Sequence, residues 1–264
     1  MSALSHIPWT ERELRRLMVK ACAALARNHL VAATDGNVSA RLGSDRVLVT
    51  PSGVSKGDVT ELDILLCDMD GRKVRGRGES SSEVHVHLAA YRNREDIGAV
   101  VHAHPPIATA FTFAGLQDVL REPVVPEVVA QIGPIPCVPY IQPGTRALAE
   151  AVGQAFRDCD VVLMAQHGAA TVAKDPWAAY LRMEKLEHFA GIVKTARELA
   201  AGAGQKIITL SDEQVNDLRA GYGKGKLKSA AAVATASVSG SGSDAIVERI
   251  AAEVLARLQK PLAR

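Results

Sequence analysis

Three histidines are the first candidates for chemistry in this sequence. His102 and His104 lie two residues apart in a valine-rich segment, and His167 follows a second apolar segment. If the first segment is a strand, this spacing places both imidazoles on one face. Three imidazoles from two strand ends can bind Zn²⁺ tetrahedrally and leave one position open, as catalytic zinc requires. The alternative is two unrelated sets of strand-end histidines, because a His-x-His pair alone is a weak signal.

A glutamate at the start of a predicted helix is the candidate for proton transfer. Glu83 directly follows a run of three serines at 80–82. A carboxylate with a tuned pKa in such a position can act as a general base. The alternative is a glutamate whose charge only complements the dipole at the helix N-terminus.

Small-residue turns form a third candidate group, for binding an anion. They lie at 36–39 and 50–53, and Ser81 and Ser82 add hydroxyl groups at the helix start. Backbone N–H groups and hydroxyls in such turns can cradle a phosphate. Each turn taken alone is also compatible with a plain loop.

The elements expected to carry these residues are short strands and helices in mixed order. Short turns between neighbouring strand signals favour an antiparallel or mixed sheet, with helices on both faces. The pattern predicts strands at 47–49, 64–69, 97–103, 161–164 and 169–172, an extended segment at 135–140, and helices at 10–29, 83–91, 107–113, 145–156 and 177–201, with a last one starting at 211.

Composition excludes several classes of protein. The chain has 264 residues, 47% of them hydrophobic, and 31 basic against 29 acidic residues give a net charge of +2. That balance argues against a nucleic-acid binder, and no apolar run reaches the roughly 18 residues of a membrane span. The N-terminus lacks a secretory signal pattern. Four scattered cysteines indicate reduced thiols in a cytoplasmic protein.

The C-terminal part differs in composition from the rest. Residues 229–243 contain only Ala, Ser, Gly, Val and Thr, and predict a flexible linker after a single domain at 1–228. Apolar residues then recur with helical spacing, with charged residues on the opposite face. Residues 244–264 are therefore expected to form a short amphipathic helix on a tether.

Six short motifs, taken in order, resemble the class II aldolase/adducin-head family. The resemblance extends over about residues 8–225. It implies an α/β fold, a three-layer α/β/α sandwich with a central mixed, largely antiparallel sheet, assembled as a homotetramer with active sites between subunits. The motifs are TDGNVS at 34–39, TPSG at 50–53, SSE at 81–83, HAHP at 102–105, PGT at 143–145 and QHG at 166–168.

The resemblance also implies a role for each matching residue. His102, His104 and His167 match three zinc ligands, and Glu83 matches a carboxylate that removes and returns protons. The phosphate-binding set comprises Asn37, Ser52, Gly53, Ser81 and Ser82, with Thr34 and Gly36 shaping the turn.

The activity implied by the resemblance is retro-aldol cleavage of a sugar phosphate. A zinc-dependent member of the family would cleave a ketose 1-phosphate of the fuculose or rhamnulose type to dihydroxyacetone phosphate and lactaldehyde. One alternative is L-ribulose-5-phosphate 4-epimerase, although that branch typically has Asp where this chain has Glu83. Another is a different sugar-phosphate member such as a methylthioribulose-phosphate dehydratase. A non-catalytic adducin-like interaction domain is the alternative from another class, and it predicts no bound metal.

One position departs from the family pattern. Glu127 stands where the aldolases place a tyrosine from the neighbouring subunit, near the aldehyde-side hydroxyl. Glu127 could substitute as proton donor, or Tyr140 or Tyr222 could approach. The alternative is that Glu127 is a solvated loop residue.

The C-terminal segment resembles the encapsulation peptides of bacterial microcompartment cargo. Such a helix lays its apolar face into a groove on a shell protein or another cargo chain. The resemblance implies a location in a compartment lumen within the cytoplasm and a partner bound through residues 244–264. Docking on its own tetramer and a self-associating coiled coil are the alternatives; membrane binding is disfavoured because the polar face is not predominantly basic.

Overall fold

The computed structural model describes residues 9–222 of the chain. The predicted linker at 229–243 and the predicted helix at 244–264 lie outside the described residues. Within them, no helix is long and apolar enough to cross a membrane.

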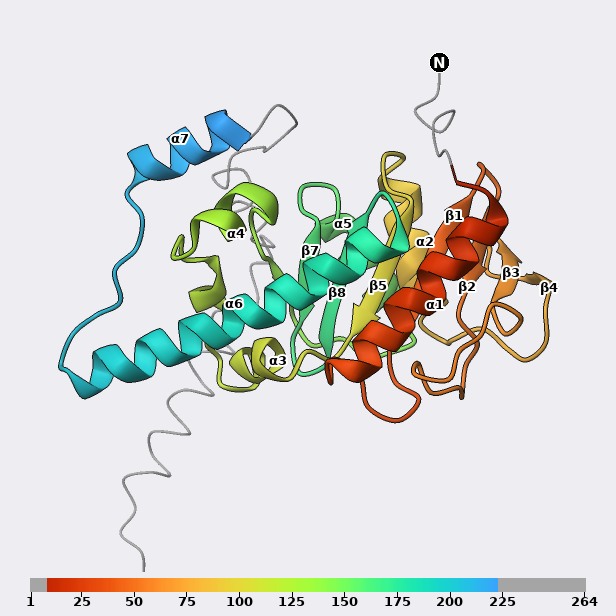
Figure 1. The fold of residues 1–264 in the computed structure, drawn as a ribbon, viewed down its shortest axis with the longest axis horizontal. Helices are drawn as coiled ribbons and strands as arrows, with labels where there is room; N and C mark the ends of the chain where they lie inside the picture. Colours follow the sequence, from red (N-terminus) through yellow and green to blue (C-terminus); the bar gives the residue numbers. More distant parts are fainter. Residues whose placement is uncertain (1–8, 223–264) are drawn as a thin grey trace, which may run out of the picture. The chain divides into compact units, whose positions relative to one another are not determined.

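An eight-stranded sheet forms the centre of the fold (Figure 1). Its strand order is β4-β3-β2-β1-β5-β8-β7-β6, and every neighbouring pair is antiparallel except the parallel pair β6 and β7. This confirms the prediction of a mixed, largely antiparallel sheet. The strands are β1 (Asn37–Leu42), β2 (Arg46–Val49), β3 (Leu65–Asp68), β4 (Lys73–Arg75), β5 (Ala99–Ala103), β6 (Cys137–Val138), β7 (Val161–Met164) and β8 (Gly168–Ala173).

Helices cover both faces of this sheet. Figure 1 shows α1 (Glu11–Arg27) and α6 (Pro176–Gly202) side by side across one face. The helices α2 (Val84–Asn93) and α5 (Arg146–Ala155) pack together on the other face. The remaining helices are α3 (Pro106–Phe113), the 3-10 helix η2 (Gln117–Arg121), α4 (Pro126–Gln131) and α7 (Asp212–Tyr222).

Alternation along the strands divides the core into two layers. Val101 of β5 is buried with α1 and α6, whereas its neighbour Val100 is buried with α2 and α5. Val161 and Val162 of β7 divide in the same way. Successive side chains of a strand point to opposite faces, so a strand buried on both faces reads as a continuous apolar run. The predicted three-layer α/β/α sandwich is therefore the observed architecture.

Side-chain caps fix where the main helices begin. Thr10 and Glu13 form a reciprocal capping box at α1. Thr145 accepts a hydrogen bond from the Leu148 N–H at α5. Asp175 does the same for Ala178 at α6, with Pro176 in the first turn.

Two segments differ from the sequence-based expectation. Residues 36–39 were expected to form a turn, but only Gly36 has the positive φ of one, at 73°, and β1 begins at Asn37. The turn-forming residues Asp35 and Gly36 directly precede β1, and the polar residues within it did not indicate a strand buried on both faces. Glu127 was weighed as a loop residue, but it lies in the first turn of α4, which Pro126 starts.

Candidate active site

Strand register brings the three histidines to one end of the sheet. His102 is on β5, opposite Asn37 of β1 on one side and Ala170 of β8 on the other. His104 follows β5, and His167 lies in the tight turn between β7 and β8. His102 and His167 are 65 residues apart in sequence, yet the β5–β8 pairing places them together.

The imidazoles converge closely enough to share one metal ion. Nε2 of His102 lies 3.2 Å from Nε2 of His104. Ring centroids are 4.9 Å apart for His102 and His167 and 5.4 Å apart for His104 and His167. One nitrogen from each ring falls within 4.8 Å of the others. Three imidazoles so placed can bind one metal ion.

Groups behind the histidines fix how two of the rings face. The carbonyl oxygen of Ala169 lies 2.9 Å from His102 Nδ1 and accepts its proton, so Nε2 is the nitrogen that faces the other site residues. A carboxylate oxygen of Asp35 lies 3.5 Å from His104 Nδ1. Burial, together with the charges of His102 and His167, lowers the pKa of His104 to about 4, so this ring is neutral at pH 7, as metal binding requires.

Gly168 provides a steric test of this arrangement. A Cβ at this position would lie 2.5 Å from the carbonyl oxygen of Ala103 and 2.7 Å from the ring of His104. Both distances are shorter than real contacts allow, so only glycine lets the β7–β8 turn approach the histidines. The converging nitrogens, the oriented ring of His102 and this close approach fit a metal centre.

Glu83 lies directly against the histidine cluster. Its Oε2 is 3.1 Å from His102 Nε2, and its Oε1 is 3.1 Å from His167 Nε2. It occupies the position before α2 without capping the helix through its side chain, which disfavours the interpretation as a simple helix-start residue. Burial raises the pKa of Glu83, but hydrogen bonding and charge interactions with His102 and His167 outweigh this and hold it well below its ordinary value.

Hydrogen bonds join the three segments of the predicted phosphate site. Asn37 Nδ2 donates to Ser81 Oγ and to Glu83 Oε2, each at 3.2 Å. The backbone N–H of Ser52 donates to the Glu79 carbonyl at 2.8 Å, beside a β-bridge between residues 51 and 80. Asn37 is buried, whereas Ser52 is exposed. Hydrogen bonds thus connect the segments at 37, 52 and 79–83 beside Glu83.

The remaining members of the predicted phosphate set lie in the same place. Gly53 has a φ of 72° and Gly36 one of 73°, so both need the left-handed conformation that glycine adopts readily. Gly36 is also sterically required, because a Cβ there would lie 2.9 Å from the His102 carbonyl oxygen. Thr34 and Ser82 are exposed beside these turns.

Two of the aldehyde-side candidates, Glu127 and Tyr140, are not joined to this cluster within the described residues. Among the described residues, no hydrogen bond or ion pair links Glu127 or Tyr140 to the histidines or to Glu83. Both side chains are exposed, Tyr140 by 59%. Tyr222 is the last residue of α7, and its side chain is not described.

Two residues near the site were missed by sequence reasoning. Asp35 contacts His104, and Lys56 is a buried lysine whose Nζ binds the Thr34 and Val54 carbonyls at 2.9 and 2.8 Å. Their positions were the available signals: Asp35 lies inside the motif at 34–39, and Lys56 is the third residue after TPSG. Nothing in those positions revealed burial or the approach of a ring.

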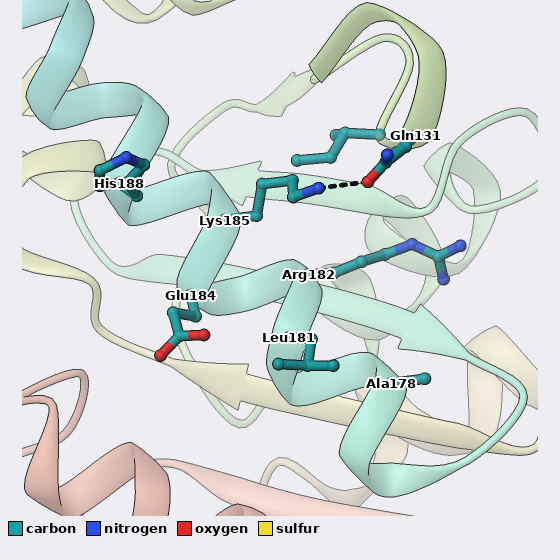
Figure 2. Close-up of a pocket in the computed structure, with 8 residues that line it drawn as sticks. Gln131, Ala178, Leu181, Arg182, Glu184, Lys185 and His188 are labelled. Carbon is teal, nitrogen blue, oxygen red and sulfur yellow. Dashed lines mark hydrogen bonds between the residues drawn. The ribbon is translucent and has the colours of Figure 1, made fainter. Parts of the chain in front are cut away.

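A large groove lies away from this chemistry. It has a volume of about 690 Å³ and runs between α4 and α6, with a hydrogen bond from Lys185 to Gln131 across it (Figure 2). Apolar side chains such as Leu181 line it together with charged ones. None of the predicted site residues is among those that line it.

Comparison with known proteins matches this picture. An L-fuculose phosphate aldolase of Methanococcus maripaludis is 35% identical over 172 residues, which cover 65% of this chain and 91% of that protein. A 3-oxo-tetronate 4-phosphate decarboxylase of Haemophilus influenzae is 31% identical over 211 residues, covering 79% of this chain and 97% of that protein. A solved L-fuculose 1-phosphate aldolase superposes with a TM-score of 0.69 at 27% identity, covering 79% of this chain and 95% of that one.

The family model for the class II aldolase and adducin N-terminal domain matches residues 16–193. That range begins inside α1 and ends inside α6, so it contains the central sheet, the histidine cluster, Glu83 and the phosphate turns. The chain belongs to the class II aldolase and adducin N-terminal domain family.

Proposed function

We propose that this protein is a zinc-dependent class II aldolase that cleaves a ketose 1-phosphate to dihydroxyacetone phosphate and a short aldehyde. The matching relatives of the family are lyases. The proposed substrates are L-fuculose 1-phosphate or L-rhamnulose 1-phosphate, with lactaldehyde as the second product. The observation that carries the proposal is the contact of one carboxylate, Glu83, with two of three converging histidines.

Each group has a defined task in this reaction. His102, His104 and His167 hold the zinc ion. When bound, zinc supplies Lewis-acid stabilisation of the negative charge that develops on substrate oxygens as the carbon–carbon bond breaks. In the synthetic direction the Glu83 carboxylate, which its low pKa keeps ionised, removes a proton from C3 of dihydroxyacetone phosphate. In the cleavage direction the same carboxyl group returns that proton to the carbon that becomes C3.

The phosphate turns are proposed to orient the substrate toward Glu83, the proton-transferring group. Asn37, Ser52, Gly53, Ser81 and Ser82 are proposed to bind the phosphate, with Thr34 and Gly36 shaping the turn. Binding energy from this remote group supports orientation at the reacting carbons. Asn37 also donates to Glu83, so the phosphate site and the proton-transferring group share one side chain.

The leaving half of the substrate needs a second proton carrier. As the bond breaks, the hydroxyl of the future aldehyde must lose its proton to a base. Glu127, Tyr140 or Tyr222 of a neighbouring subunit is proposed for this role, because within one chain neither Glu127 nor Tyr140 makes a hydrogen bond or ion pair with the described site residues. This assignment requires the homotetramer, with each active site completed between subunits.

A second candidate reaction has support from a relative. The Haemophilus influenzae decarboxylase covers 79% of this chain, more than the Methanococcus maripaludis aldolase does. Decarboxylation of a 3-oxo acid phosphate and retro-aldol cleavage both leave a carbanion equivalent beside a carbonyl, which the same metal can stabilise. The L-ribulose-5-phosphate 4-epimerase reaction is a third possibility with the same groups.

A substrate panel separates these reactions. Zinc-loaded protein is offered L-fuculose 1-phosphate, L-rhamnulose 1-phosphate, L-ribulose 5-phosphate and a 3-oxo-tetronate 4-phosphate, and dihydroxyacetone phosphate, carbon dioxide and C4 inversion are measured. Release of dihydroxyacetone phosphate with an aldehyde supports the aldolase. Release with carbon dioxide, or inversion without release, supports an alternative, and no turnover with no bound metal supports an adducin-like interaction domain.

The C-terminal segment is proposed to direct the enzyme to a microcompartment. Removal of residues 229–264 is expected to leave cleavage activity intact and to abolish association with the shell or another cargo protein. Co-purification of full-length and truncated chains with shells measures this. Loss of catalysis in the truncated chain, or unchanged association, would contradict it.

A further inference from the structure

Lys56 is a buried cation that the proposed reaction does not use. Its side chain is 1% exposed, and within residues 9–222 Arg41 is the other buried cationic residue. Nζ donates to the Thr34 carbonyl at 2.9 Å and to the Val54 carbonyl at 2.8 Å. Both acceptors are neutral, and no ion pair of Lys56 occurs among the described residues. Burying a charge without a paired carboxylate is costly.

The two acceptors belong to the two turns of the proposed phosphate site. Thr34 lies two residues before Gly36, and Val54 directly follows Gly53. The Thr50 N–H donates to the Val38 carbonyl, and the Val38 N–H donates to Thr50 Oγ1, which joins the segments that these turns adjoin. The two hydrogen bonds of the buried Lys56 ammonium group join the turns themselves.

The charge environment favours an anion at this place. Burial lowers the pKa of Lys56, while the negative charges facing it, on Cys22 when ionised and on Asp35, act in the opposite direction. Cys22 is buried, which raises the pKa of its thiol to about 12 and leaves it neutral at pH 7. Asp35 is itself directed to His104. Among the described residues, Lys56 thus has no carboxylate ion-pair partner, and its positive charge lies behind the turns at Thr34 and Val54.

We infer that Lys56 is a positioning residue of the phosphate site, whose ammonium group fixes the turns at Thr34 and Val54 to each other and supplies positive charge beneath a bound phosphate monoester. The inference rests on the proposed function and deepens it, because it names a determinant of selectivity for phosphorylated over unphosphorylated substrates. If Lys56 only held the two turns together, it would stabilise the fold without increasing the affinity for a phosphate monoester.

Phosphate binding separates these two roles. Zinc-loaded wild type, Lys56→Met and Lys56→Arg are titrated with inorganic phosphate by calorimetry, with Arg41→Met as the control. Arg41 is equally buried and also donates to backbone carbonyls, those of Tyr91 and Arg94, but on the far part of β1. Lys56→Met is expected to weaken phosphate binding by about tenfold, Lys56→Arg by less, and Arg41→Met by less than twofold.

Kinetics give a second readout. With the ketose 1-phosphate that the wild type cleaves, Lys56→Met is expected to raise KM by about tenfold while kcat changes less than threefold. Zinc content and circular dichroism of each variant are measured alongside. If Lys56→Met does not fold, Lys56→Gln, which keeps a hydrogen-bond donor without the charge, takes its place.

The outcomes separate this inference from the proposed function. Wild type that binds phosphate, with Lys56→Met and Lys56→Gln binding it within twofold of wild type, overturns the role of Lys56 alone. Wild type that binds neither inorganic phosphate nor any phosphorylated ketose overturns the phosphate site and the inference with it. Equal weakening by Arg41→Met would show that only loss of a buried cation matters, and would also overturn the role.

Discussion

The site has a metal half, formed by His102, His104 and His167, and a phosphate half, formed by the turns that carry Asn37, Ser52, Gly53, Ser81 and Ser82. The two halves are built in different ways. His102 is placed by strand register on β5 and is only 2% exposed, His104 directly follows this strand, and His167 lies in the tight turn between β7 and β8. The phosphate donors lie on turns, and Ser52 and Gly53 are exposed. A sheet holds a metal site rigidly because its hydrogen bonds fix every residue, whereas turns depend on a few specific contacts.

Glu83 stands between these halves. It contacts His102 and His167 on one side and receives a hydrogen bond from Asn37 on the other. The comparison therefore predicts that substitutions in the different parts of the site reduce activity to different extents and for different reasons. Changes in the metal half should abolish activity through loss of metal, changes at Glu83 should slow proton transfer, and changes in the turns should weaken substrate binding.

The largest effect is expected from His167→Ala. Removing one of three protein ligands should reduce bound zinc from about one ion per chain to nearly none, with complete loss of cleavage. Metal content by mass spectrometry measures this directly. Full zinc occupancy in the variant would show that His167 is not a ligand.

Glu83→Gln should come next. The amide keeps the shape but cannot exchange a proton, so kcat should fall by about 10²- to 10⁴-fold with zinc retained. Steady-state kinetics and metal content, compared with the surface variant Glu61→Gln, measure the effect. A kcat within threefold of wild type would remove Glu83 from the mechanism.

Asp35→Asn should have an intermediate effect on the metal half. Asp35 lies 3.5 Å from His104 Nδ1 and is about half exposed, so its charge supports the ligand only moderately. Zinc affinity should fall by about tenfold, measured by competition with a chelator. Unchanged affinity would show that the sheet alone positions His104.

Ser52→Ala should act on the phosphate half alone. Loss of one exposed hydroxyl should raise KM for a ketose 1-phosphate about three- to tenfold, with kcat and zinc content unchanged. Ser55→Ala, two residues beyond the motif, is the matched control. A fall in kcat without a change in KM would contradict the division between the halves.

The smallest effect at neutral pH is expected from the buried His87, through the free energy of unfolding. His87 is 1% exposed and lies 2.7 Å from Ser39 Oγ, and burial first, then the charge of His102, lowers its pKa to about 3. Between about pH 3 and 6.5 the unfolded chain then binds the extra proton. The free energy of unfolding should therefore fall as pH decreases through this range, by on the order of 3 kcal/mol for this group.

Denaturant unfolding at several pH values tests this effect. The metal-free protein is compared with its His87→Gln variant between pH 7 and pH 4. The variant should show a shallower pH dependence, because glutamine does not titrate. Parallel curves for the two proteins would contradict the assignment to His87.

The sequence predicted the metal half better than the phosphate half. Valine-rich segments identified β5 and β7, so the spacing of His102 and His104 could be placed on a strand. β1 was missed because it directly follows the turn-forming residues Asp35 and Gly36, and because the burial of its polar residues depends on partners in α2 and the segment before it. Lys56 gave no signal either, because its acceptors are backbone carbonyls of turns whose meeting is a tertiary event.

Metal dependence of cleavage tests the central claim most directly. Dihydroxyacetone phosphate release from the preferred ketose 1-phosphate is measured before chelation, after chelation with zinc loss verified by mass spectrometry, and after zinc is restored. The account predicts loss of release with zinc and recovery with its return, in wild type but not in His167→Ala. Undiminished release from verified metal-free protein would contradict it.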